Sequence, residues 1–315
     1  MDSKIKKWIM VMLAVLVISA AVAGFMPEWK KTSAIGKGKD YVAEIRIDGT
    51  IYGGPRNGTL LGASEGVSSE QVMYEMEQAR KDNRVKGVLL RINSPGGSTG
   101  ATQEIAEEMD KIKNAGKPIV VSMGDMCASA GYWLASKGDY VFANPATLTG
   151  SIGVYMDYTN VEELMGKLGV KNEKIKSGAH KAILSMYRPM TGDEQKMLQT
   201  MVDDIYSQFV KTVADGRRME ESRVRSVADG RILTGQQAME LGLVDAMGNY
   251  YDALNYAGGV AGIEGDSVPV KRYSVGTSWK NILAGEMDSA VRSLAKNISD
   301  NIWGTFSQTP APSVR

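Results

Sequence analysis

Two short segments of the chain carry residue types that could act together as a nucleophile and its base. Ser129 lies in a turn of small residues, Met126-Cys-Ala-Ser-Ala-Gly-Tyr132, and Lys181 ends the segment Lys176-Ser-Gly-Ala-His-Lys181. A serine hydroxyl becomes a useful nucleophile when a nearby base removes its proton, and that base is an amine in some enzymes and an imidazole in others. The pairing predicts a Ser/Lys peptidase.

The residues alone leave the identity of the base open between two neighbours. His180 is the only histidine in the chain, so a Ser-His-Asp triad would have to use it. An exposed lysine has a pKa near ~10.4 and is protonated at neutral pH, whereas burial can lower that pKa by ~3–5 units. If the segment is extended, one of His180 and Lys181 points inward and the other outward. Sequence spacing does not say which.

A second glycine-containing turn is a candidate oxyanion hole. Asn93-Ser-Pro-Gly-Gly97 follows an apolar run and precedes a helix expected to begin near Ala101. Two glycines allow the backbone to approach a ligand and to aim N–H groups at an anion, although the same sequence also suits an ordinary strand-to-helix turn. Ser129 has a similar setting, in which the next N–H, that of Ala130, would face the developing oxyanion. The serine lacks the G-x-S-x-G pattern because Cys127 takes the first glycine position.

Composition excludes several classes of partner. The 315 residues, 43% of them hydrophobic, suit one sizeable domain with accessories or at most two domains. A net charge of +1 provides no field to recruit nucleic acid, so no nucleic-acid partner is expected. The single cysteine, Cys127, cannot form an intrachain disulfide and is expected to pack rather than react. The chain has no metal-ligand cluster and no phosphate-loop pattern, and we predict no cofactor and no metal.

The N-terminus predicts a membrane anchor. Lys4, Lys6 and Lys7 precede an uncharged apolar run over residues 8–26. At about 1.5 Å per residue this run approaches the ~30 Å hydrocarbon thickness, and the preceding lysines favour the cytoplasmic side. We therefore expect a single-pass protein of the cell membrane with a cytoplasmic N-terminus and an extracytoplasmic catalytic domain. The alternative is a cleaved signal peptide, because Ala21-Val-Ala23 fits a small-x-small cleavage site.

The remaining pattern alternates between strands and helices. Compact or alternating apolar runs over 42–47, 85–92 and 119–123 predict strands, and the segments between them carry apolar residues at helical spacing. This order predicts a β-α-β-α-β arrangement with parallel strands and helices on the faces. Residues 191–214 predict a long amphipathic helix, and we expect its apolar stripe to be core. The stripe consists of Met197, Met201, Ile205 and Phe209.

Four ordered motifs together resemble the signal peptide peptidase A family, membrane-anchored bacterial Ser/Lys proteases of the S49 type. They are Asn93-Ser-Pro-Gly-Gly97, Ala128-Ser-Ala-Gly-Tyr132, Leu148-Thr-Gly-Ser-Ile-Gly153 and Ser177-Gly-Ala-His-Lys181. The resemblance runs from Val42 to Gly248. It implies an α/β fold of the ClpP/crotonase-like kind, with repeated β-β-α units in a superhelix. It also implies cleavage of leftover signal peptides, a location at the cytoplasmic membrane, and a homo-oligomer shaped as a ring or dome.

Residue by residue, the resemblance implies a complete catalytic site. It assigns Ser129 as nucleophile, Lys181 as general base and Ser151 as the hydroxyl that orients the lysine, with an oxyanion hole of backbone N–H groups from Gly96, Gly97 and Ala130. Relatives often carry glycine at position 130, but an alanine still donates its N–H. The chain length is similar to that of a short form with one catalytic domain, in which each subunit supplies both serine and lysine.

The predicted organisation divides the chain into five segments. The segments are a cytoplasmic N-terminus (1–7), a transmembrane anchor (8–26), a linker (27–39), an S49-like protease domain (40–265) and a C-terminal helical extension and tail (266–315). Residues 279–315 could form a core-packing helix, a subunit contact or an interfacial membrane helix.

Two alternative functions remain open for the chain: an S49-like protease that processes other membrane or secreted peptides, and a catalytically inactive scaffold paralogue. A crotonase-type acyl-CoA enzyme is disfavoured because an external domain would be separated from cytosolic CoA.

Overall fold

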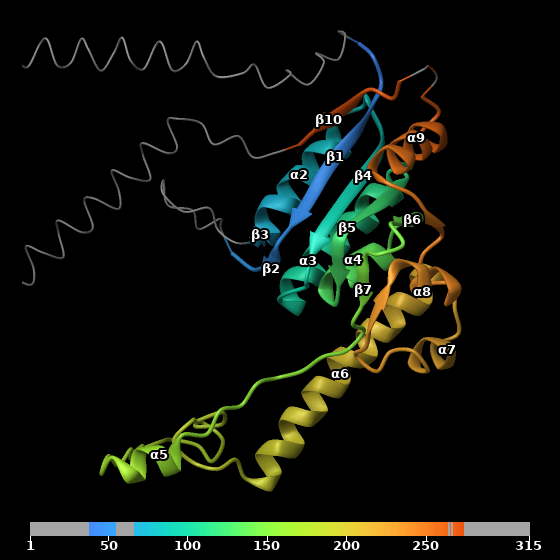
Figure 1. Ribbon diagram of the computed structural model, residues 1–315. Helices are drawn as coiled ribbons and strands as arrows, with labels where there is room; N and C mark the ends of the chain where they lie inside the picture. Colours follow the sequence, from blue (N-terminus) through green and yellow to red (C-terminus); the bar gives the residue numbers. More distant parts are fainter. Residues whose placement is uncertain (1–37, 55–65, 264, 266, 274–315) are drawn as a thin grey trace, which may run out of the picture. The chain divides into compact units, whose positions relative to one another are not determined.

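The computed structural model describes residues 38–54, 66–263, 265 and 267–273, and its centre is a mainly parallel β-sheet (Figure 1). The main path runs β10 (Val270–Arg272), β1 (Tyr41–Asp48), β4 (Val85–Ser94), β5 (Ile119–Ala128), β6 (Tyr140–Ala143) and β9 (Ala246–Met247). Each neighbouring pair on this path is parallel. The strands predicted over 42–47, 85–92 and 119–123 are confirmed as parts of β1, β4 and β5.

Helices cover both faces of this sheet, as the alternating pattern predicts (Figure 1). Helices α2 (Ser69–Lys81) and α3 (Thr99–Asn114) pack together and against the central strands. Helix α9 (Tyr250–Val260) packs on the sheet through Ala253, Leu254 and Ala257, which form one buried cluster with residues of β1, β4, β5 and β6. The mixed α/β class and the β-α-β-α-β order are therefore confirmed.

A small extension of the sheet and a separate strand pair lie where the central strands end. Strand β7 (Leu148–Gly150) pairs with the last residues of β5, beyond the part of β5 that pairs with β6, and β8 (Ile232–Thr234) pairs antiparallel with β7. Strands β2 (Thr50–Tyr52) and β3 (Gly66–Ser68) form a separate parallel pair. The remaining helices are α4 (Ala130–Ser136), α5 (Glu162–Lys167), α6 (Gly192–Arg217), α7 (Glu221–Arg225) and α8 (Gly235–Glu240).

The long helix predicted over 191–214 is confirmed as α6, but its apolar stripe is core only in its C-terminal half. Phe209 is 1% exposed and stacks on the Trp133 ring of α4, with ring centroids 4.7 Å apart. Met197 and Met201 are 42% and 49% exposed. The expectation that the whole stripe is core is therefore wrong, because the first turns of α6 extend beyond the sheet and α4 (Figure 1). We call residues 154–202, which include these turns, the arm.

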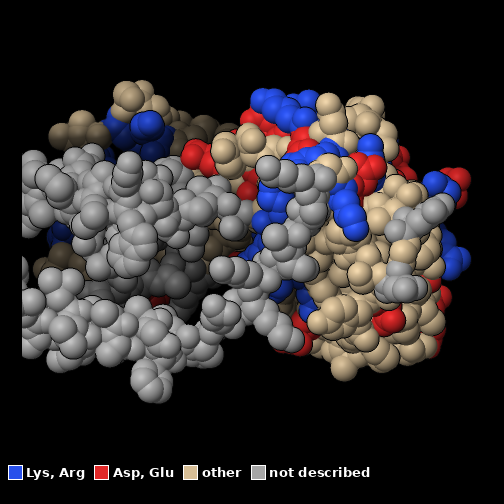
Figure 2. All heavy atoms as spheres, turned by 90° about the horizontal axis from the view of Figure 1, so that it is seen from above, with Lys and Arg blue, Asp and Glu red and all other residues tan. Residues whose placement is uncertain are grey.

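The predicted single-pass membrane location is not supported by the structure, which corrects that expectation. Among residues 38–54, 66–263, 265 and 267–273, no helix combines the length and the apolar character needed to cross a membrane. The predicted anchor over residues 8–26 lies outside the described residues, as do its flanking segments 1–7 and 27–37 and the C-terminal segment 279–315. The face shown in Figure 2 carries both basic and acidic side chains, in keeping with the near-neutral net charge.

Candidate active site

Ser129 lies at the sharp junction between β5 and α4, where the predicted strand-turn-helix setting is confirmed. It is the residue that immediately precedes α4, and its φ of 52° is rare for a residue with a side chain. Such backbone strain of about 1–3 kcal/mol persists only where the surroundings enforce it, and it concentrates at functional sites. One enforcing contact is the Ser129 N–H, which donates to the Gly150 carbonyl of β7 at 2.9 Å. The side chain is partly exposed, so a substrate can reach it.

The glycine turn predicted as an oxyanion hole lies directly against Ser129. A Cβ atom on Gly96 would come within 2.8 Å of the Ser129 Cβ, and a Cβ on Gly97 within 2.0 Å of the Ile51 carbonyl oxygen. Their φ values of 117° and 156° also disfavour other residues. The turn is held by β2, because Ile51 N–H donates to the Gly96 carbonyl and Ser98 N–H donates to the Ile51 carbonyl, both at 2.9 Å. Both glycines are therefore required by close packing.

The three N–H groups predicted for the oxyanion hole differ in what they already bind. Gly96 N–H donates to the buried Ser94 hydroxyl at 3.1 Å. In the part of the chain that the structure describes, no acceptor is found for the N–H of Gly97 or Ala130. Ala130 is the first residue of α4, and the first N–H groups of a helix have no partner within it. Of the three predicted groups, those of Gly97 and Ala130 thus have no acceptor among the described residues.

Ser151 lies beside the nucleophile through the pairing of two parallel strands. Ala128 at the end of β5 is in register with Gly150 at the end of β7, so the residues that follow them, Ser129 and Ser151, are neighbours. Ser151 also has a left-handed backbone, with φ 51°, and its N–H donates to the Arg231 carbonyl at 2.8 Å. The structure therefore groups the predicted nucleophile, the lysine-orienting hydroxyl and the glycine turn in one place.

Polar contacts that sequence reasoning missed support this group. The Asn93 amide oxygen accepts from Met126 N–H at 3.1 Å, across an irregularity in the β4–β5 pairing. Gly124 makes room for it, since a Cβ there would lie 2.9 Å from the Asn93 side chain. The Thr149 hydroxyl donates to the Cys127 carbonyl at 2.7 Å. Asn93 and Ser94 belong to the predicted glycine turn, but no sequence pattern pointed to their partners.

Lys181, the predicted base, lies apart from this group in the same chain. It is exposed, in a turn near the start of α6, and its N–H donates to the Gly178 carbonyl at 3.2 Å. The turn is tied to Glu194 in the first turn of α6, whereas α6 meets α4 at Phe209. Those two positions on one helix are about 22 Å apart at 1.5 Å per residue. The structure thus does not bring the Lys181 amine to Ser129, and His180 is equally exposed on the same turn.

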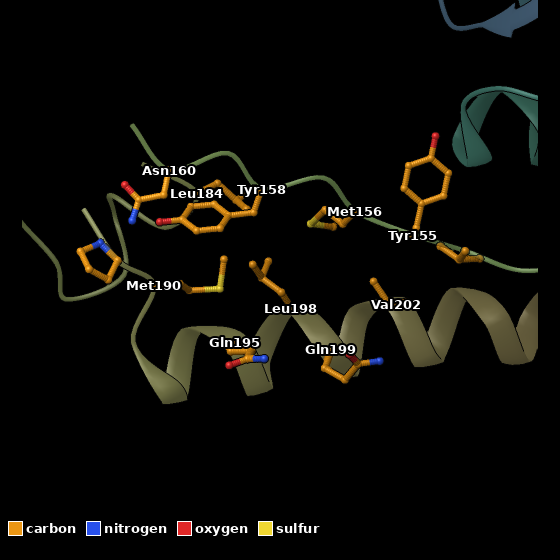
Figure 3. Close-up of a pocket in the computed structure, with 12 residues that line it drawn as sticks. Tyr155, Met156, Tyr158, Asn160, Leu184, Met190, Gln195, Leu198, Gln199 and Val202 are labelled. Atoms are coloured by element: carbon orange, nitrogen blue, oxygen red, sulfur yellow. The ribbon is translucent and has the colours of Figure 1, made fainter. Parts of the chain in front are cut away.

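The arm carries an open, largely apolar cavity of about 620 Å³ between residues 154–160 and the first half of α6. Figure 3 shows Met190 and Leu198 extending toward the ring of Tyr158. Other apolar side chains of the arm are open to solvent: Tyr155 is 83% exposed, and Ile175 is fully exposed. Most of the exposed large apolar side chains among the described residues lie in the arm, and such a concentration is typical of a surface that binds another molecule.

The site shows no sign of metal or thiol chemistry among the described residues. Within those residues, no group of three or more His, Cys, Asp or Glu side chains is positioned to hold a metal ion. Cys127 is fully buried beside the nucleophile turn, and burial raises the pKa of its thiol far above the ordinary value. A thiol held protonated in this way is a poor nucleophile. Ser129 is therefore the nucleophile candidate at this junction.

Comparisons with known proteins point to proteases. Residues 111–264 match the family described as Peptidase family S49, and residues 59–149 match the family described as Clp protease. The "Putative protease slr0021" of Synechocystis sp. is 37% identical over 257 residues, which cover 82% of this chain and 87% of that protein.

Two further relatives carry more specific names. The "Putative signal peptide peptidase SppA" of Enterococcus faecium is 38% identical over 227 residues, covering 72% of this chain and 65% of the relative. "Protease 4" of Haemophilus influenzae is 35% identical over 216 residues, covering 69% of this chain but only 34% of the relative. The chain thus matches most of the Synechocystis protein but only a part of the Haemophilus protein.

Proposed function

The chain belongs to peptidase family S49, and from that membership we propose that it is a serine endopeptidase with Ser129 as nucleophile and Lys181 as general base. The observation that carries the proposal is the Ser129 junction. A strained serine precedes a helix, and Gly96 lies so close that no side chain fits between them. A preformed, partly exposed junction of this kind presents a hydroxyl next to unpaired N–H groups, which is what acyl transfer requires.

The proposed reaction uses these groups in two steps. Neutral Lys181 takes the proton from the Ser129 hydroxyl as its oxygen attacks the scissile carbonyl carbon, and the N–H groups of Gly97 and Ala130 bind the resulting oxyanion. The carbon–nitrogen bond then breaks, and the lysine ammonium returns the proton to the leaving amine. A water molecule deprotonated by the same lysine attacks the acyl-enzyme and releases Ser129. Ser151, next to Ser129, would accept a hydrogen bond from the lysine and so orient it.

The distance between Ser129 and Lys181 in one chain supports a dyad that is completed between chains. A base needs to lie within about 3 Å of the proton it removes, and α6 carries the Lys181 turn well away from α4. The arm also exposes apolar side chains that suit burial against a neighbour. We therefore propose a homo-oligomer, a closed ring or dome, in which the arm of one subunit delivers Lys181 to Ser129 of the next. Burial of an amine between subunits disfavours its charged form, and a lysine acts as a base only in its neutral form.

The proposed substrates are remnant signal peptides, released when secreted proteins are processed. Support comes from the printed name of the Enterococcus relative and from the apolar cavity of the arm. The alternative substrates are other membrane or secreted peptides, which an S49 protease of the same mechanism would cleave. We also propose that the sheet and its helices form the repeated β-β-α superhelix of the ClpP/crotonase-like fold, supported by the match to Clp protease.

The test is hydrolysis of a fluorogenic peptide library by the full chain and three variants. We expect Ser129→Ala and Lys181→Ala to lose activity by at least about 10³-fold, while His180→Ala keeps most of it. Loss on His180→Ala with survival of Lys181→Ala would reject the lysine as base. If the parent chain cleaves no peptide and Ser129 is not labelled by a fluorophosphonate, the chain is an inactive scaffold instead.

A further inference from the structure

The turn that carries Lys181 is held by one arginine–glutamate pair. Arg188 donates from Nη2 to the Ala182 carbonyl at 2.9 Å, which is the carbonyl next along the chain from Lys181. The same guanidinium donates to both carboxylate oxygens of Glu194, at 2.8 and 2.6 Å. One planar side chain thus connects the lysine turn to the first turn of α6.

Glu194 is a rigid anchor for this connection. It is 2% exposed, and besides Arg188 it accepts a hydrogen bond from Thr191 N–H at 3.0 Å as part of a capping box that starts α6. The Arg188 hydrogen bonds, with help from the Thr191 N–H, hold the pKa of this carboxyl down to about 2. A bidentate pair fixes orientation as well as distance, which a single ion pair does not.

Two other side chains bind carbonyl groups in or next to the turn. The Tyr158 hydroxyl donates to the Arg188 carbonyl and, at 3.5 Å, to the Ser185 carbonyl. Lys176 Nζ donates to the Ala179 carbonyl at 2.6 Å. Residues 177–184 themselves form only turns, with no helix or strand to stiffen them. The conformation of the lysine turn therefore depends on side chains bound to its backbone, and Arg188 is the one that connects the residue after Lys181 to α6.

We propose that Arg188, anchored by Glu194, is a positioning residue that sets where the arm presents the Lys181 amine. This inference rests on the proposed function, since it assigns Arg188 a role in aligning the general base. Arg188 does not touch the substrate. Its effect comes from the geometry of the turn, and misplacing a catalytic group by about 1 Å can cost on the order of 10²-fold in rate.

The experiment compares Arg188→Lys, Glu194→Gln and their double variant with the parent chain in peptide hydrolysis. Arg188→Lys keeps the positive charge but removes the bidentate contact with Glu194. We expect kcat at neutral pH to fall by about 10-fold or more in each single variant, with KM changed less than about twofold. Because the two residues act as one unit, the double variant should be about as impaired as either single variant.

The pH profile separates positioning from simple destabilisation. If Arg188 positions the general base, the limb of the kcat/KM profile that reports the base should shift in these variants. A matched control is Arg217→Lys, since Arg217 forms a similar bidentate pair with Asp245 at 2.9 and 2.6 Å, remote from the lysine turn. That variant should lose activity only in proportion to its folded fraction, with an unshifted profile.

The outcomes distinguish a failure of the positioning role from a failure of the proposed function. If Lys181→Ala is inactive but Arg188→Lys and Glu194→Gln match the parent in kcat and pH profile, Arg188 is not a positioning residue. The positioning role is equally rejected if the activity of these variants falls only with their folded fraction, as in the control. If Lys181→Ala retains full activity, the proposed function itself fails.

Discussion

The nucleophile junction and the arm are built in opposite ways. Ser129 follows a central strand, and its backbone is held by a hydrogen bond to β7 and by close contact with Gly96. Lys181 lies on an exposed turn whose described supports are local and include Arg188 and Tyr158. In the proposed dyad, the nucleophile is therefore preorganised within one chain, whereas the base has to be brought to it. Under this proposal, catalysis depends on how the arm of one subunit meets the next subunit.

The largest expected effect tests whether the two regions meet between chains. Ser129→Ala and Lys181→Ala should each be inactive alone, yet a mixture that has been dissociated and reassembled should regain activity. Some mixed contacts would join an intact Ser129 to an intact Lys181. The measurement is peptide hydrolysis as a function of mixing ratio. A mixture that stays inactive, although mass spectrometry shows mixed oligomers, would place the complete dyad within each chain.

A smaller but still large effect is expected at the nucleophile junction. Gly96→Ala adds a Cβ atom 2.8 Å from the Ser129 Cβ, at a φ of 117° that disfavours alanine. Displacing the oxyanion groups should lower kcat by about 10²–10³-fold. Gly100→Ala is the matched control, because nothing lies within 4 Å of its added Cβ. Equal activity of the two variants would show that the Gly96 turn does not shape the site.

The two halves of α6 should respond differently to truncation. Phe209→Ala removes a ring that is 1% exposed and stacked on Trp133, and should lower the free energy of unfolding by about 3–5 kcal/mol. Met197→Ala, at a side chain that is 42% exposed, should change it by less than about 0.5 kcal/mol. Denaturant unfolding at a concentration where the chain is monomeric measures both. A similar loss for Met197 would mean that the arm is buried within the single chain.

The smallest effect concerns the acid sensitivity of the arm. Hydrogen bonds from Arg188 lower the pKa of Glu194 from 4.5 to about 2. The carboxylate therefore stabilises the arm fully above about pH 4.5, and this contribution is lost as the pH falls toward 2. Hydrogen exchange of the α6 N-terminus should accelerate over that range in the parent.

Two variants define the origin of that acid effect. Glu194→Gln should exchange faster already at pH 6 and show little further change on acidification, because it cannot be protonated. Asp229→Asn removes a comparable pair with Arg231, whose hydrogen bonds also lower the Asp229 pKa to about 2, but this pair lies outside the arm. Asp229→Asn should leave the pH dependence of hydrogen exchange in the arm as in the parent. An unchanged pH response in Glu194→Gln would mean that another group governs the arm.

Sequence patterns were reliable where short-range rules apply. Periodicity located β1, β4, β5 and α6, because side chains of a buried strand or an amphipathic helix must repeat with the geometry of that element. The glycine turn was identified for a similar reason, since two adjacent glycines suit a backbone that other residues avoid. The same reasoning misjudged Met197 and Met201, because a helical stripe shows which face is apolar and not whether anything covers it.

The sequence by itself determined the chemistry available to this protein: a serine in a tight strand-to-helix turn, adjacent glycines, and lysine and histidine as candidate bases. The tertiary structure decided which of these groups meet. Strand register brought Ser129 and Ser151 side by side, and the Ser94 hydroxyl bonds Gly96 N–H while leaving that of Gly97 free. The fold also places Lys181 on the arm, away from Ser129. Distances across a fold follow from packing between elements remote in sequence, which no local pattern encodes.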